Sequence, residues 1–489
     1  MEGKGYARVL TAQPVGIGAE LITVEADLSR GLHAFSIVGL ADKAVAEARD
    51  RISSAIKNAG YKPPKATNRR IVLSLSPASL RKDGSQYDLP LAVAYLIAAG
   101  HMQAPQDRIL FCGELGLDGC VRPVRNVLAH ARCALEAGIR DIVVPDENAQ
   151  EALLVRGIHV YPVSHLHELI AHLNREVLIS PAKKEYRGIL PLAGIDFAEI
   201  HGQEGAKRAL TIAAAGRHNI VLYGPPGSGK TMLARSLPTI LPSLTEQESL
   251  QATAIYSAAG QLTPGEIVER APFRSPHHTI STSAMIGGGP SLRPGEVSLA
   301  SGGVLFMDEF VEFDSRTLEA LRQPLEDRVV SIARTKGAFL FPADFMLVAA
   351  MNPADTLAGD DSVIRQKTQR QAQKLSRPIV DRIDIWIEVP RVSQAVLMEQ
   401  IQGTTSAEVR ERVETVRTMT ATQLETVCAT EAEEALHTAM DRLQLSLRGL
   451  ARTKRVAQTI ALLSGAAQIE LPHVLEALQY RPRGFMGNA

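Results

Sequence analysis

One eight-residue segment, GPPGSGKT at residues 224–231, constrains the fold of this chain more than any other feature. A mostly apolar run, residues 218–223, directly precedes it, and a helical pattern begins at Met232. A strand, a turn of the form GxxxxGK[ST] and a helix in immediate succession are typical of a phosphate-binding loop. The segment therefore predicts an α/β unit with a mostly parallel sheet and a nucleotide at the carboxyl end of a strand.

The residue types in this segment have distinct tasks in phosphate binding. The glycines let backbone N–H groups turn inward, Lys230 places a positive charge on the β- and γ-phosphates, and the Thr231 hydroxyl is a ligand for Mg²⁺. A glycine-rich turn without a ligand is the alternative, which the flanking strand and helix disfavour. The predicted cofactors are ATP and Mg²⁺, and the predicted binding residues are Gly224, Pro225, Pro226, Gly227, Ser228, Gly229, Lys230, Thr231 and Met232.

Polar residues follow two further apolar runs of the same region. Residues 304–307 end in Asp308 and Glu309, and residues 345–351 end in Asn352. At the carboxyl end of a strand, Asp308 is expected to hold Mg²⁺ through water and Glu309 to activate the attacking water. The Asn352 amide is expected to bond the γ-phosphate or that water, although an asparagine before proline is also a common turn.

Arginines are candidates for the remaining positive charge. Arg382 precedes the strand-like run 383–387, and Arg448 and Arg455 lie in a helical tail. An arginine supplied to a neighbouring subunit's phosphate stabilises charge in the transition state. Each of these residues could equally form a surface ion pair, so chemistry alone leaves their roles open.

The N-terminal part of the chain, residues 1–175, is predicted to be a compact α/β domain. Residues 34–38 and 71–75 are strand-like, and helical patterns follow each of them. These patterns end in Ala-Gly pairs at residues 59–60 and 99–100, which suit the C-terminal caps of helices.

The rest of the chain divides into a linker and two blocks, in agreement with a length of 489 residues that is too great for one ordinary core. Residues 176–195 are polar and rich in turn formers, which is typical of a linker. Residues 196–390 alternate short apolar strands with helices. Residues 391–489 are expected to be almost entirely helical, and residues 445–478 within them have apolar residues at helical spacing.

Composition limits the classes of function. The chain has 53 basic and 53 acidic residues, and this zero net charge disfavours nucleic-acid binding by the whole surface but allows a local basic channel. No apolar run approaches the roughly 18 residues of a membrane span, and no apolar signal core follows the start. We expect a cytoplasmic protein without a membrane partner. The four scattered cysteines have no C-x-x-C spacing and are expected to be reduced thiols.

These motifs resemble the ComM/YifB family of magnesium-chelatase-like AAA+ ATPases, and the resemblance covers nearly the whole chain. It implies an AAA+ P-loop core at residues 196–390 with a helical lid at 391–489. The N-terminal block resembles the Lon protease domain, which has a ribosomal-S5-like fold. Besides the phosphate loop, the resemblance rests on residues 31–40, 80–85, 196–204, 272–280, 286–289, 293–296, 321–327, 349–353 and 476–481.

The resemblance implies roles for particular positions. Asn352 matches the sensor 1 residue, Arg382 the arginine finger that acts across the subunit interface, and Arg448 the sensor 2 arginine. Residues 280–297 match the helix 2 insert and residues 329–336 the pre-sensor 1 hairpin, both of which face the central pore in related rings. The family's assigned activity is that of a hexameric helicase driving branch migration of DNA in natural transformation, with single-stranded and branched DNA and recombination proteins as partners. The DNA contacts expected at the pore are Arg293, Arg328, Arg334 and Lys336.

The chain departs from the family pattern after Asn352. Family members carry a cysteine cluster there that resembles a zinc knuckle, but this chain has no cysteine between Cys133 and Cys428. We therefore expect no zinc. A basic segment could hold DNA phosphates in its place, although a solvated loop is the alternative. Its candidate residues are Arg365, Lys367, Arg370 and Lys374.

Two further patterns are interpreted as structural. Lon enzymes use a serine activated by a lysine, but Ser85 is misplaced and no lysine lies between Lys82 and Lys183, so we expect a binding or assembly domain and no protease. His277 and His278 are adjacent, which makes joint binding of one metal ion rare, and structural or interface roles are expected.

Three rival functions remain beside the DNA motor. A chelatase-type ATPase would remodel a protein partner, but no metal-binding adhesion-type segment is found in this chain. A protein unfoldase would need a separate protease. A nucleotide-dependent scaffold would bind ATP and DNA without needing turnover.

Overall fold

The computed structural model describes residues 5–40, 42–184, 194–263, 266–289, 292–334, 337–352, 375–392, 403–422, 427–443 and 445–482. The chain forms two compact units, of which the first comprises Met1–Gly188 and Leu250–Ile267 and the second Ile189–Ser249 and Val268–Ala489. The first unit thus includes a segment that lies within the sequence block 196–390. No helix in the described ranges is long and apolar enough to cross a membrane.

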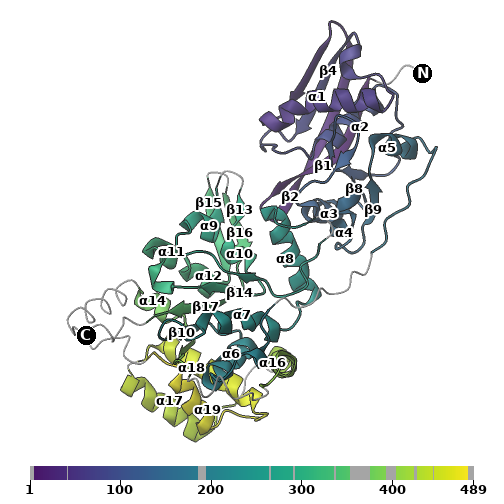
Figure 1. Ribbon diagram of the computed structural model, residues 1–489. Helices are drawn as coiled ribbons and strands as arrows, with labels where there is room; N and C mark the ends of the chain where they lie inside the picture. Colours follow the sequence, from purple (N-terminus) through teal and green to yellow (C-terminus); the bar gives the residue numbers. More distant parts are fainter. Residues whose placement is uncertain are drawn as a thin grey trace. The chain divides into compact units, whose positions relative to one another are not determined.

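The first unit is built on a mixed seven-stranded sheet (Figure 1). Its first two strands form an antiparallel hairpin, and the strands at the far end run parallel. In spatial order the strands are β3 (Ala34–Val38), β4 (Arg69–Ser76), β2 (Gly18–Arg30), β1 (Tyr6–Val15), β5 (Ile109–Phe111), β8 (Asp141–Pro145) and β9 (His159–Val163).

Helices cover this sheet and contribute about half of its buried core residues. The strands predicted at 34–38 and 71–75 are confirmed as β3 and β4. The two predicted helix ends are also confirmed, because Gly60 and Gly100 follow the capping alanines with left-handed φ values of +87° and +78°. The helices are α1 (Lys43–Asn58), α2 (Asp88–Ala98), α3 (Val127–Glu136), α4 (Ala149–Ala152), α5 (Leu166–Leu173) and the part of α8 (Glu246–Ala259) from Leu250 onward.

The second unit contains a five-stranded sheet in which every pairing is parallel. This confirms the parallel α/β sheet that the alternating apolar strands predict. The strand order is β11 (Phe273–Arg274), β14 (Val304–Met307), β17 (Met346–Met351), β10 (Ile220–Tyr223) and β18 (Ile385–Glu388).

Alternate residues of these strands point into two different cores. In β10, Ile220 and Leu222 pack with α6 (Glu204–Gly216), α7 (Lys230–Ile240) and the C-terminal helices. Val221 points to the other face and packs with Met285 and Phe310. Because both faces are covered, the strands are almost uniformly apolar, as expected for a parallel sheet.

Two pairs of short strands and a group of helices complete the second unit. The hairpin β15 (Val329–Arg334) and β16 (Gly337–Pro342) lies beside the pair β12 (Gly287–Gly288) and β13 (Arg293–Pro294), since a Cβ on Gly288 would contact Ile332 at 3.8 Å. The described residues after β18 are almost entirely helical, and α16 and α18 lie beside α6 (Figure 1). The remaining helices are α9 (Thr282–Ile286), α10 (Glu296–Leu299), α11 (Ser315–Ala320), α12 (Arg322–Asp327), α14 (Arg377–Val380), α16 (Ser406–Thr422), α17 (Thr430–Leu443), α18 (Leu447–Leu463) and α19 (Leu471–Gln479).

Candidate nucleotide site

The loop at residues 224–229 joins the end of β10 to the start of α7. Gly224 is held where a Cβ would lie 2.2 Å from the carbonyl oxygen of Val389, so no larger residue fits. Gly227 and Gly229 have φ values of +78° and +91°, and a Cβ on either would meet nothing within 4 Å. Gly227 and Gly229 are therefore required by the backbone conformation rather than by packing. They leave open space beside the N-terminus of α7, where an anion is favoured.

Lys230 lies at the first position of α7 and points into the loop. Its Nζ donates to the carbonyl oxygens of Gly224 and Pro225, each at 2.8 Å, and to Ser228 Oγ at 3.3 Å. Burial lowers the pKa of Lys230, and the charge of Asp308 opposes that shift. The ammonium is thus held inside the cradle by carbonyl groups with which phosphate oxygens would compete.

The two predicted magnesium ligands meet at the carboxyl edge of the sheet. Thr231 Oγ1 donates to Asp308 Oδ2 at 3.1 Å, and the N–H of Glu309 donates to Asp308 Oδ1 at 2.9 Å. A hydroxyl and a carboxylate fit Mg²⁺, which takes oxygen ligands and usually keeps several waters. In the described ranges no group of three or more His, Cys, Asp or Glu residues could hold a metal ion.

Asn352 follows β17 at the same edge. β17 pairs with β10 so that Met351 is opposite Tyr223, and the Gly224 N–H donates to the Met351 carbonyl oxygen at 3.2 Å. Asn352 is therefore placed beside the start of the phosphate loop. The last residue of the predicted binding set, Met232, lies in α7 and is partly exposed.

The two predicted arginines, Arg382 and Arg448, lie in a separate cluster around Glu326. Arg382 is buried, donates from Nη1 to the Pro378 carbonyl oxygen at 2.7 Å and forms a short ion pair with Glu326. Arg448 is exposed, and its Nη2 lies 2.9 Å from the other oxygen of Glu326. The Glu326 pKa is lowered, chiefly by the hydrogen bond from Arg382.

This arginine cluster lies at the opposite edge of the sheet from the phosphate loop. The Asn219 side chain donates to the Arg382 carbonyl oxygen at 3.0 Å, and Asn219 is the residue before β10. The phosphate loop begins after β10, at the other end of the same strand. The structure therefore brings Lys230, Thr231 and Asp308 together and separates them from Arg382.

The candidate DNA contacts that the structure describes have different surroundings. Arg293 is exposed on β13, and Arg334 is the last residue of β15. Arg328 lies just before β15, where its Nη1 is 3.4 Å from Asp344 Oδ1. Lys336 and the basic segment with Arg365, Lys367, Arg370 and Lys374 lie outside the described residues.

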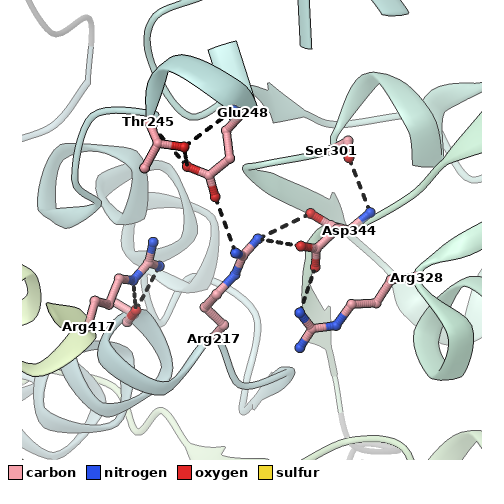
Figure 2. Close-up of polar contacts among 8 residues, drawn as sticks. Arg217, Thr245, Glu248, Ser301, Arg328, Asp344 and Arg417 are labelled. Carbon is pink, nitrogen blue, oxygen red and sulfur yellow. Dashed lines mark hydrogen bonds and ion pairs between the residues drawn. The ribbon is translucent and has the colours of Figure 1, made fainter. Parts of the chain in front are cut away.

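Several interacting residues were not identified from the sequence. Glu326 has no motif of its own that marks it as the partner of two arginines. At the amino edge of the sheet, Arg217 Nη2 lies 3.0 Å from Asp344 Oδ2, and Arg217 Nη1 donates to Glu248 at 3.4 Å (Figure 2). These pairs join residues far apart in sequence, so only the paired strands reveal them.

His278 is a further residue with an unexpected contact. Its Nδ1 lies 3.3 Å from Glu309 Oε2, the carboxylate that the sequence assigns to water activation. The register of β11 against β14 could have predicted this contact. β11 pairs Arg274 with Leu305 of β14, and His278 and Glu309 lie four residues after these two residues.

Comparison with known protein families matches three segments of the chain to one type of protein. Residues 196–397 match the family described as magnesium chelatase, subunit ChlI, and residues 403–481 match the C-terminal part of that subunit. Residues 24–148 match the family described as subunit ChlI of Mg-chelatase.

Several curated proteins are similar over nearly the full length. Competence protein ComM of Haemophilus influenzae is 39% identical over 97% of this chain and 97% of its own. The YifB protein of Salmonella typhimurium is 38% identical with the same two coverages. Lon protease of Rhizobium meliloti is 25% identical over 165 residues, which is 32% of this chain and 20% of that protein.

Proposed function

Because the chain belongs to the ComM/YifB family of magnesium-chelatase-like AAA+ ATPases, we propose that it hydrolyses ATP to move single-stranded or branched DNA through a ring of subunits. The contact between Thr231 and Asp308, beside the Lys230 cradle, carries this proposal. It joins the start of α7 to the turn after β14, which lie 77 residues apart, in one oxygen-lined site next to the glycine-rich turn.

Each residue of this site has a separate role in ATP hydrolysis. Lys230 neutralises phosphate charge, and the backbone N–H groups of the loop orient the phosphates. Thr231 and Asp308 would hold Mg²⁺, which neutralises charge on the β- and γ-phosphate oxygens when bound. Glu309 accepts a proton from the attacking water, and Asn352 fixes that water or the γ-phosphate.

The arginine cluster supports action between subunits. Arg382 and Arg448 share Glu326 at the edge of the sheet that faces away from their own phosphate loop. A positive pair so placed serves the nucleotide of a neighbouring subunit in a head-to-tail ring, because such an interface brings two different surfaces together. We propose six subunits from the family resemblance alone.

The DNA part of the proposal depends on the two inserts and on a relative's name. β12–β13 and β15–β16 lie side by side, and they carry Arg293 and Arg334. One full-length relative is named a competence protein, and a role on DNA is what the family resemblance implies. Phosphate contacts of this kind give binding that weakens steeply with salt.

The test is ATP hydrolysis by the purified full chain with and without forked and four-way DNA. We expect DNA to stimulate turnover, and both stimulation and unwinding to fall as salt rises from about 50 to about 200 mM. Lys230→Ala should abolish nucleotide binding. Glu309→Gln should lower turnover by roughly 100-fold or more while ATP and DNA still bind. Hydrolysis that never responds to DNA, with no DNA binding at low salt, would contradict a DNA motor.

A protein-remodelling ATPase is the second candidate. The match of three chain segments to a magnesium chelatase subunit favours it. In that case, turnover should respond to a protein partner and be indifferent to DNA, so the same assay separates the two functions.

A further inference from the structure

We propose that His278 is a positioning residue that holds the Glu309 carboxylate in place for water activation; this inference rests on the ATPase function proposed above. The imidazole Nδ1 lies 3.3 Å from Glu309 Oε2. With its proton on Nδ1, the ring donates to one carboxylate oxygen and leaves the other, Oε1, able to accept from water.

The contact follows from the register of two neighbouring parallel strands. β11 and β14 pair Phe273 with Val304 and Arg274 with Leu305. Continued past the carboxyl ends, the same offset brings His278 beside Glu309. The adjacent pair of histidines is therefore at the edge where Asp308 and the phosphate loop also lie.

Glu309 needs an external partner because of its own backbone. Its φ is +51°, a left-handed conformation that non-glycine residues seldom adopt and that costs roughly 1 kcal/mol or more. The side chain is 54% exposed, so without a partner it would sample several rotamers. A strained residue held at the end of a strand is typical of functional sites.

His278, in contrast, is held firmly. Its ring centroid is 4.1 Å from that of His277 and 6.5 Å from that of Phe313, and the His278 and Phe313 rings meet in a T-shaped arrangement. His277 uses its own Nδ1 for Thr279 Oγ1 at 2.8 Å. The two histidines are thus not equivalent: His277 supports the turn, and His278 directs its Nδ1 at the carboxylate.

The first test compares kcat and KM for ATP in variants that separate the Nδ1 hydrogen bond from ring packing. His278→Ala should lower kcat by roughly tenfold with little change in KM, because a displaced catalytic group affects the chemical step. His278→Asn places an amide N–H close to the position of Nδ1 and should recover to within about threefold of the wild-type kcat. His278→Gln and His278→Phe should not recover.

The matched controls are His277→Ala and the double variant of His278→Ala with Glu309→Gln. His277→Ala should stay within about twofold of wild type, because His277 does not contact Glu309. The double variant should be no slower than Glu309→Gln alone, since residues that act as one unit are not additive. Equal losses at His277 and His278, rescue by phenylalanine, or additive losses would each overturn the inference in favour of packing.

The second test does not depend on turnover. In protein labelled with ¹⁵N-histidine, the His278 ring, assigned by its loss in His278→Asn, should show the Nδ1–H tautomer and should lose it in Glu309→Ala. A His278 spectrum that is unchanged by Glu309→Ala would overturn the inference. Absence of ATP hydrolysis by the wild-type protein would instead refute the proposed function, so the two failures are distinguishable.

Discussion

His218 shows how one buried residue makes the stability of the second unit depend on pH. The side chain is 1% exposed, and its Nε2 pairs with Thr459 Oγ1 of α18 at 2.8 Å. Burial lowers its pKa to about 4, while Asp384 opposes the shift and Arg455 and Arg452 add to it. In its neutral form, the His218 side chain therefore links the segment that precedes β10 to helix α18.

We expect this histidine to destabilise the second unit in mild acid. In the unfolded chain the His218 side chain has a pKa near 6.5, so on acidification it takes up a proton there at a higher pH than in the folded chain. The contribution of neutral His218 to the unfolding free energy is therefore complete above about pH 6.5. It is lost as the pH falls toward about 4, by about 3 kcal/mol in total. Urea unfolding followed by fluorescence of Trp386, the sole tryptophan of the chain, reports the second unit directly.

The matched comparison is His218→Gln against His437→Gln, a change at an exposed histidine of α17. The first variant should flatten the difference in unfolding free energy between about pH 7 and about pH 5, and the second should leave it as in wild type. Equal pH dependence in all three proteins would mean that carboxylates, not His218, determine the acid sensitivity.

At the scale of elements, the contacts of Asp344 hold the two ends of the β15–β16 hairpin at the sheet. Its carboxylate pairs with Arg217, which precedes β10, and with Arg328, which precedes β15, and its N–H donates to Ser301 Oγ at 3.2 Å (Figure 2). Arg217 also contacts Glu248 in the first turn of α8. One carboxylate thus connects both legs of the hairpin to the amino edge of the sheet.

Asp344→Asn should loosen these contacts without unfolding the unit. The paired side chains are about one-quarter to one-half exposed, so we expect a loss of roughly 1 kcal/mol in unfolding free energy. Hydrogen exchange should rise in β15 and β16 and at the start of α8, while β10 and β17 stay protected. Arg322→Ala, which removes an exposed pair with Glu319, is the control and should leave exchange in the hairpin unchanged. Exchange in the hairpin that is the same in Asp344→Asn as in wild type would mean that Asp344 does not fasten it.

How far the elements could be predicted depends on whether the signal is local. β14, at Val304–Met307, was predictable to the residue because a short apolar run ends in two carboxylates. β11 was not predicted, since Phe273 and Arg274 form only a two-residue edge strand without apolar periodicity. The contacts of Glu326 and Asp344 depend on partners 16 to 127 residues away, and no local pattern encodes such pairs.

At the scale of the whole molecule, the proposed function divides the catalytic residues between the two edges of one sheet. The carboxyl edge of its sheet has the phosphate loop with Lys230, and the amino edge has Arg382. The strand between them, β10, has four residues, and with the residues that flank it the two edges are separated by roughly 15 Å at a strand rise of about 3.3 Å per residue. Under the proposed function, hydrolysis therefore needs two adjacent protomers.

Mixing two inactive variants tests this arrangement. Lys230→Ala destroys the phosphate loop but keeps the arginine, and Arg382→Ala does the reverse. In an equimolar mixture that assembles at random, an intact loop faces an intact arginine at about a quarter of the interfaces, so about a quarter of wild-type turnover should return. The mixture must be compared with Lys230→Ala mixed with the double variant, which offers no complete interface and should stay inactive. Because each parent variant alone hydrolyses little ATP, recovered turnover can only arise where the arginine of one protomer reaches the nucleotide of another. A mixture that stays inactive although mixed rings form would show that Arg382 acts within its own chain or not at all.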